Sequence, residues 1–227
     1  LTKGVDQSEI HSRQNLIFHT DLAIQMFTDR ADQFGQRLGS DVHVDRFGLE
    51  RDEYDSLDPI YVIDHDENGR HLSSMRLLPS TGRTMLNDHF RHFYNGPTLS
   101  SPDIWECSRF CVARGSDRKS APRLLAACAR LMFEMSIEQL AATFGPPMER
   151  IYSMSGSVPE VIGTGLTPHG EVSVGLWQYS MSSYRKLLRV SGLDSTELEL
   201  NIANSDVCND VLKYDRSKAN RPFVHVD

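Results

Sequence analysis

Residues 103–110, Asp-Ile-Trp-Glu-Cys-Ser-Arg-Phe, place an acidic and a basic side chain inside a strand-like run. Glu106 and Arg109 are three positions apart within the run from Ile104 to Val112. Side chains of a strand alternate between its faces, so we expect these two on opposite sides. Burying a carboxylate or a guanidinium in a central strand is costly unless each has a partner. The pattern therefore indicates a functional site.

Two more charged segments precede this run. Residues 50–55 read Glu-Arg-Asp-Glu-Tyr-Asp, and residues 74–79 read Ser-Met-Arg-Leu-Leu-Pro. In this order and spacing the segments resemble the acyl-homoserine-lactone synthases, the bacterial autoinducer synthases. The matching positions are Arg30 and Phe34; Glu50, Asp52, Tyr54 and Asp55; Arg76 to Pro79; and Glu106, Ser108, Arg109 and Phe110.

The resemblance covers roughly residues 20–190 and departs from the family at one position. The family usually carries Trp six residues after the Phe, where this chain has Ser40. Either the wall that this Trp supplies is missing or another aromatic residue, such as Phe47, replaces it.

The resemblance implies a quorum-sensing enzyme with a two-step reaction. The α-amine of S-adenosylmethionine attacks an acyl thioester, and the methionine carboxylate then attacks its own γ-carbon, expelling methylthioadenosine and closing the lactone. Both molecules are substrates, no cofactor is expected, and the acyl donor is acyl carrier protein or acyl-CoA. The implied catalytic residues are Glu106, Arg109 and Asp52. The implied S-adenosylmethionine site comprises Arg30, Phe34, Asp52, Asp55, Arg76 and Phe110.

The same charges permit a structural interpretation. Three arginines and three acids could form one buried ion network that shapes the loop at 39–59, and Glu106 could be a structural partner of Arg76 or Arg109. The network and the site could also be one object.

An acyl chain needs an apolar tunnel, and a carrier needs a docking surface. The candidate tunnel residues, from their positions on the predicted central strands and long helix, are Met85, Trp105, Leu125, Met132, Met154 and Trp177. The resemblance adds Ser153 and Ser155, which lie where family members often carry Thr or small residues. Between residues 109 and 130 basic side chains outnumber the single acid Asp117, on a chain of net charge −7. The resemblance favours this segment as a docking patch for acyl carrier protein, through Arg114, Arg118, Lys119 and Arg123.

The rest of the composition limits the other functions. A net charge of −7 argues against general nucleic-acid binding. No apolar run approaches the length of a membrane span, and the first residues lack the pattern of a signal peptide. The four cysteines and nine histidines show no metal-ligand spacing, so we expect buried thiols, no metal site and a cytoplasmic protein.

The order of elements predicts one α/β domain, an α-β-α sandwich with a mixed central sheet. The resemblance implies the same, a fold similar to the GCN5-type N-acetyltransferases. We expect a flexible arm over 1–17, the synthase domain over 18–215 and a polar tail over 216–227. Expected helices lie at 20–38, 120–144, 158–163, 182–190 and after 195, and residues 84–93 form a short helix or an irregular lid. Expected strands lie at 60–66 and 71–78, which form a hairpin, and at 104–113, 149–155 and 170–180. The strands at 104–113 and 149–155 should splay to admit the pantetheine arm.

Two alternatives are weighed. Another N-acyltransferase of this fold would use acyl-CoA, and such enzymes usually carry a glycine-patterned pyrophosphate loop that residues 114–119 lack. A non-catalytic small-molecule-binding relative, suggested by Ser40, should have lost some of the charged motif residues, yet all are present.

Overall fold

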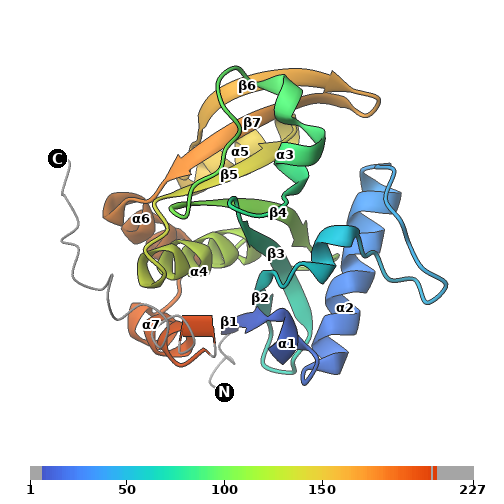
Figure 1. Cartoon of the computed structure of the whole chain (residues 1–227). Coiled ribbons are helices and arrows are strands. Elements are labelled where there is room, and N and C mark those ends of the chain that lie inside the picture. Colours follow the sequence, from blue (N-terminus) through green and yellow to red (C-terminus); the bar gives the residue numbers. More distant parts are fainter. Residues whose placement is uncertain (1–6, 206, 209–227) are drawn as a thin grey trace.

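The computed structural model describes residues 7–205, 207 and 208, so the predicted tail at 216–227 lies outside them. Seven strands form one mixed sheet in the order β1-β2-β3-β4-β5-β7-β6. Helices α4, α6 and α7 cover one face of the sheet and α2 covers the other (Figure 1), which confirms the predicted α-β-α sandwich. The strands are β1 (Gln7–Ser12), β2 (Ile60–His65), β3 (His71–Pro79), β4 (Ile104–Val112), β5 (Gln139–Phe144), β6 (Glu160–Thr167) and β7 (Gly170–Gln178). The α-helices are α1 (Arg13–Leu16), α2 (Thr20–Arg30), α3 (Met85–His89), α4 (Ser120–Glu134), α5 (Pro146–Ser155), α6 (Met181–Ser191) and α7 (Ser195–Ala203).

The first half of the sheet is antiparallel, and its strands follow the predicted hairpin. Residues 66–69 turn the chain between β2 and β3, with Asp66 accepting hydrogen bonds from the turn backbone and Gly69 at φ 74°. Residues 7–17, expected to lie in a flexible arm, instead form β1 and α1, and β1 pairs with β2 along its length. The prediction failed because Ser8 and Ile10 are buried while the other face of β1 is polar, as in an edge strand.

A β-bulge in β4 decides which side chains reach the site. Ser74 pairs with Cys111 but Arg76 pairs with Ser108, so β4 carries one extra residue there. Arg109 takes up the irregularity with φ 54°, an uncommon value for a side chain larger than glycine. Glu106 and Arg109 therefore both face the α2 and α3 side, contrary to the predicted opposite faces. For the same reason Cys107 and Cys111, which strict alternation would put on one face, lie on opposite ones.

The second half of the sheet differs most from the prediction. Helix α4 ends at Glu134, and Ser136, at φ 55°, turns the chain into β5. The expected helix over 120–144 is therefore wrong after residue 134, where the apolar residues of β5 continued the helical pattern. Pro146 and Pro147 begin α5 rather than end a helix, because proline suits the first helical turn. The expected strand at 149–155 is α5, and the expected helix at 158–163 falls mostly in β6.

The splayed pair is β4 and β5. Their parallel pairing runs from Ile104 to Glu106 and stops there, whereas β5 pairs with β7 along its whole length. The strand predicted to splay from β4, at 149–155, is thus replaced by β5 in that role. Within the described part of the chain, no helix has the length and apolar character needed to cross a membrane.

Candidate active site

Three arginines and three acids form one network between α2, the 50–56 segment and the strands β3 and β4. Arg30 Nε lies 2.6 Å from Glu50 Oε2, and its two terminal nitrogens lie 3.0 and 2.9 Å from the Asp55 carboxylate. Arg30 and Glu50 are both almost fully buried. Tyr61 Oη donates a further hydrogen bond of 2.8 Å to Asp55. These charge-assisted contacts lower the pKa of Asp55 far below its usual range despite burial.

The network continues from Arg76 and Arg109 to Asp52. Arg76 binds both oxygens of Asp52, and its Nε donates to Ser108 Oγ at 3.1 Å. Arg109 donates from Nε to Glu50 Oε1 at 3.0 Å and pairs through Nη2 with Asp52 Oδ2 at 2.8 Å. The network thus balances three positive against three negative charges.

The 50–56 segment is held in place by its own turn. Asp52 accepts hydrogen bonds from the amides of Tyr54 and Asp55, and the Asp55 carboxylate accepts one from the Asp52 amide. This reciprocal capping box starts a short 3-10 helix at residues 53–56 and fixes both carboxylates toward the arginines.

Arg109 is the arginine of this network best able to bind a further group. Its side chain is 13% exposed, against 1% for Arg30 and 0% for Arg76. Its guanidinium lies 5.3 Å from the centre of the Phe34 ring, and Nη1 lies 3.4 Å from the sulfur of Met85, a weak acceptor. A substrate carboxylate would offer Nη1 a much stronger acceptor.

Glu106 is a buried carboxylate that can accept a further hydrogen bond. It is 2% exposed, and its Oε2 accepts a hydrogen bond from the amide of Leu86 in the first turn of α3. Its Oε1 has no hydrogen-bond partner among the described residues. Burial raises the pKa of Glu106 above its usual value, against the opposing effects of the Leu86 amide and Arg76. A carboxyl group with a raised pKa and an unpartnered oxygen is suited to accept a proton from a substrate.

The raised pKa has a measurable consequence for stability. Ionising Glu106 costs more in the folded than in the unfolded protein, so its contribution is most favourable at low pH and is lost as the pH rises through the folded pKa. Glu106→Gln removes that loss. We therefore expect the free energy of unfolding of Glu106→Gln, measured with urea, to increase relative to that of wild type from pH 4 to pH 7.5. The variant becomes the relatively more stable protein as the pH rises. A difference that is independent of pH, or of the opposite sign, would contradict the assignment.

An apolar cavity lies on the other face of the sheet, where β4 and β5 separate. It encloses about 570 Å³ including its opening to solvent. Cys107 and Phe110 of β4 line it from one side, and Leu140 and Ala142 of β5 from the other. Its further walls come from α4, α5, β7, α6 and the link between β7 and α6, through Leu125, Cys128, Met132, Tyr152, Trp177, Tyr179, Ser183 and Leu187 among others.

The structure places three of the eight predicted tunnel residues on this cavity: Leu125, Met132 and Trp177. Met85 lies instead beside Arg109, and Trp105 packs against the core without lining the cavity. Because residues 149–155 are helical, Ser153 and Met154 point outward. Ser155 Oγ donates a hydrogen bond to the backbone carbonyl of Ile151 in its own helix. Sequence reasoning missed Tyr152 and the β5 residues because it assigned both segments to the wrong element.

Two aromatic residues also lie elsewhere in the structure than the sequence predicted. Phe110, expected in the S-adenosylmethionine site, lies on the cavity face because the bulge at Arg109 shifts the alternation of β4. Phe47, suggested as a replacement for the missing Trp, is 70% exposed beneath Arg46. It therefore does not form a wall of the buried site.

Gln33 occupies the edge of β4 beyond the point where β5 leaves it. Its side-chain amide donates to Phe110 O at 2.7 Å and accepts from Val112 N at 2.9 Å, as a neighbouring strand would. Arg37, from the same π-helical segment at 31–37, donates to Val112 O at 2.7 Å. The open part of the β4 edge is thereby confined to the few residues after Glu106, beside the cavity. No local sequence pattern marks Gln33, apart from its place between Arg30 and Phe34.

The predicted docking residues divide into two groups. Arg118 and Lys119 are exposed, and Arg114 is exposed but paired with Asp32 at 2.8 Å. Arg123 is instead buried, with its guanidinium 3.1 Å from Asp64 and 3.2 Å from Asp117. Arg123 therefore ties α4 to β2 and cannot take part in docking.

Comparison with known proteins identifies first the fold and then the family. The fold is shared with N-acyl-transferring enzymes: a putative N-acetyltransferase from Lactobacillus plantarum superposes with a TM-score of 0.52 at 14% identity, covering 76% of this chain and 99% of that one. The sequence also matches the autoinducer synthase family over residues 13–186. The chain belongs to the autoinducer synthase family.

Relatives within that family agree over most of the chain. An acyl-homoserine-lactone synthase of Rhizobium etli is 36% identical over 170 residues, which are 72% of this chain and 80% of that protein. The crystal structure of the synthase LasI matches with a TM-score of 0.72 at 26% identity, over 81% of this chain and 95% of that one. The CoA-dependent synthase BjaI, solved with S-adenosylmethionine and isopentyl-CoA, matches with a TM-score of 0.74 at 25% identity, over 84% of this chain and 92% of that one.

Proposed function

We propose that this chain acylates the amine of S-adenosylmethionine from an acyl thioester and closes the product to an N-acyl-homoserine lactone, releasing methylthioadenosine. The observation that carries the proposal is the arrangement around β4. A balanced ion network and a buried carboxylate face one side of this strand, and an apolar cavity of acyl-chain character lies on the other. The open edge of β4 after Glu106 joins the two sides.

We place the reacting amine at Glu106. An α-amine is mostly protonated at neutral pH and cannot attack a thioester in that form. The unpartnered oxygen of Glu106, directly or through one water, is the group that would accept its proton. The electron pair of the amine then forms the amide bond, and the thiol of the carrier leaves.

We place the methionine carboxylate at Arg109. Its Nη1 can donate to that carboxylate while Nε and Nη2 stay on Glu50 and Asp52. The sulfonium would then be next to Phe34 and the acids, which suit a cation. For lactone closure the same carboxylate attacks the γ-carbon, and the C–S bond electrons leave with methylthioadenosine.

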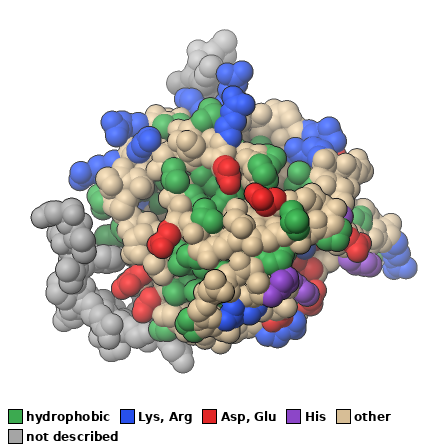
Figure 2. Space-filling model, turned by 90° about the horizontal axis from the view of Figure 1, so that it is seen from above, with side chains coloured by type: hydrophobic (Ala, Val, Ile, Leu, Met, Phe, Trp, Pro, Cys, Tyr) green, Lys and Arg blue, Asp and Glu red, His purple; other side chains and the backbone are tan. Residues whose placement is uncertain are grey.

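For the acyl donor we propose acyl carrier protein, held by a basic surface made by Arg118, Lys119, Arg185, Lys186 and Arg189. All five side chains are exposed. Lys119 lies against Gly192, at which α6 ends, and Lys186 lies against Gly156, at which α5 ends. The inner side of α6 contributes Ser183 and Leu187 to the cavity, so the basic surface borders the acyl site. In the view of Figure 2, Lys and Arg side chains lie mainly along the upper edge, while hydrophobic and acidic ones share the centre.

Reversing the charge of two residues on this surface should weaken the binding of acyl carrier protein. In Arg185→Glu/Lys186→Glu we expect a KM for acyl carrier protein at least 10-fold higher at low ionic strength, with the difference shrinking as salt rises, because charge steering is screened. The KM for S-adenosylmethionine should not change. Steady-state kinetics with carrier-linked and CoA-linked donors of the same acyl chain will measure both.

Glu149→Lys/Glu160→Lys, which changes exposed charges elsewhere, is the matched control. If the α6 variant uses the carrier-linked donor as well as wild type at low salt, the carrier does not dock here. A larger defect with the CoA-linked donor would assign the surface to the phosphates of coenzyme A.

The function itself can be tested in culture. Mass spectrometry of medium from cells expressing the chain should detect N-acyl-homoserine lactones at far higher levels than from cells expressing Glu106→Gln. The acyl length of the dominant product also reports the capacity of the cavity. Medium without lactones, despite expressed and folded protein, would contradict the proposal.

A further inference from the structure

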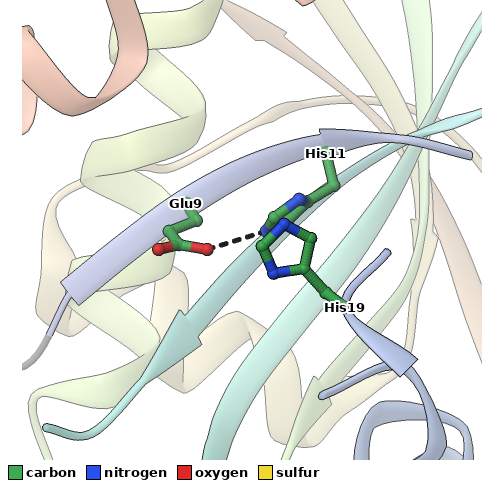
Figure 3. A group of neighbouring side chains, drawn as sticks. All are labelled: Glu9, His11 and His19. Atoms are coloured by element: carbon green, nitrogen blue, oxygen red, sulfur yellow. Dashed lines mark hydrogen bonds and ion pairs between the residues drawn. The ribbon is translucent and has the colours of Figure 1, made fainter. Parts of the chain in front are cut away.

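Glu9, His11 and His19 bring three metal-ligand side chains together at the edge of the sheet, remote in sequence from the charged motifs. One ligand atom of each lies within 4.8 Å of the others. Glu9 and His11 are two apart on β1, so they share a face of that strand. Figure 3 shows the His19 ring beside that of His11, with the Glu9 carboxylate directed at the same point. The ring centres of the two histidines are 4.5 Å apart.

The donor set suits a divalent metal of the zinc type. Two imidazole nitrogens and one carboxylate oxygen, with a fourth position for water, form a common tetrahedral zinc set. Bonds of about 2.0–2.1 Å to zinc place tetrahedral ligands roughly 3.4 Å apart. The Glu9 Oε2–His11 Nε2 separation of 2.9 Å is already in that range. His19 is exposed, so its side chain can rotate to complete the set.

Neighbouring groups prepare the ligands for such a role. Glu9 Oε1, the oxygen not directed at His11, lies 3.2 Å from His65 Nε2. His65 Nδ1 is itself 2.8 Å from the backbone carbonyl of Asp66. A ligating carboxylate held by an outer hydrogen bond is typical of metal sites in proteins. His19 is the N-cap residue of α2, yet its side chain makes no capping hydrogen bond, so its nitrogens are not committed to the helix.

We propose that Glu9, His11 and His19 bind one zinc(II) ion, with His65 orienting Glu9. The ion would join β1 to the start of α2. That helix ends at Arg30 in the ion network of the active site, so zinc would brace the element that carries Arg30. The proposal concerns a site separate from the catalytic one and does not rest on the proposed function.

The test uses the full chain without a histidine tag, freed of metal by chelator dialysis. Titration with zinc chloride against a chromophoric chelator should give one ion per chain with a Kd of micromolar or below. Cobalt(II) in place of zinc should give the intense visible absorption of a tetrahedral site. Zinc should also raise the melting temperature of the protein by several degrees, since a ligand that binds the folded state stabilises it.

His19→Ala and Glu9→Gln are the informative variants, because one removes an exposed ring and the other keeps the shape of its side chain. Each should weaken zinc binding at least 10-fold and abolish the thermal shift and the cobalt absorption. His169→Ala, which removes an exposed histidine from the turn between β6 and β7, should bind zinc like wild type. Substoichiometric binding by wild type, or a Kd weaker than micromolar, would overturn the proposal, as would unchanged binding in His19→Ala and Glu9→Gln.

Discussion

Glu106→Gln should fold normally and lose about 10²- to 10⁴-fold in kcat for acyl transfer, the usual cost of removing a general base. The substitution keeps the shape of the side chain, and the glutamine oxygen can still accept the hydrogen bond from the Leu86 amide. What disappears is the basic, unpartnered oxygen beside the open edge of β4. Rates of thiol release with purified protein at saturating S-adenosylmethionine will measure the loss.

The control for this variant is Glu138→Gln, an exposed carboxylate at the start of β5, which should keep the wild-type rate. Binding of methylthioadenosine, measured by calorimetry, should be preserved in Glu106→Gln. A rate within threefold of wild type would restrict Glu106 to a structural role as the cap of α3.

Glu50→Gln should destabilise the fold by about 3–5 kcal/mol, the range for breaking a buried ion pair on one side. Glu50 is fully buried and connects Arg30 of α2 with Arg109 of β4, at 2.6 and 3.0 Å. A neutral amide leaves two guanidinium groups short of one negative charge in a site from which water is largely excluded. Urea unfolding followed by circular dichroism will give the change in unfolding free energy.

Glu53→Gln provides the comparison, because the Glu53 side chain is 53% exposed and its only ion pair within the described residues, with His89, is 4.0 Å long. Such a surface change should alter the unfolding free energy by less than about 0.5 kcal/mol. Equal effects of the two substitutions would mean that the network is not a stabilising unit of the fold.

The sequence predicted the charged site better than the cavity, for physical reasons. The charged motifs matched the family in order and spacing, so Arg30, Asp52, Asp55, Arg76 and Arg109 could be selected before any fold was known, and the structure brings all of them together. Glu50 was visible in the acidic motif but was given no role. Its position between two arginines depends on a long-range contact that no local pattern contains.

The prediction of the cavity failed because it depended on segments assigned to the wrong secondary structure. Residues 139–144 are apolar enough to continue the α4 pattern, and the prolines at 146 and 147 suit the end of one helix as well as the start of another. That ambiguity moved the predicted splay from β5 to residues 149–155 and drew Ser153, Met154 and Ser155 into the tunnel. Likewise, strict alternation along β4 could not foresee a bulge at a non-glycine residue, so Glu106 and Arg109 were expected on opposite faces.

The most direct test of the proposed function is the product balance of the purified enzyme. The protein would be supplied with an acyl thioester and S-adenosylmethionine carrying ¹³C in its methionine portion. We expect one N-acyl-homoserine lactone bearing the label and one methylthioadenosine for each thiol released, resolved by mass spectrometry. Thiol release and an acylated amine without methylthioadenosine would make the chain another kind of N-acyltransferase. Binding of S-adenosylmethionine with no product at all would make it a non-catalytic relative, and either result would contradict the account.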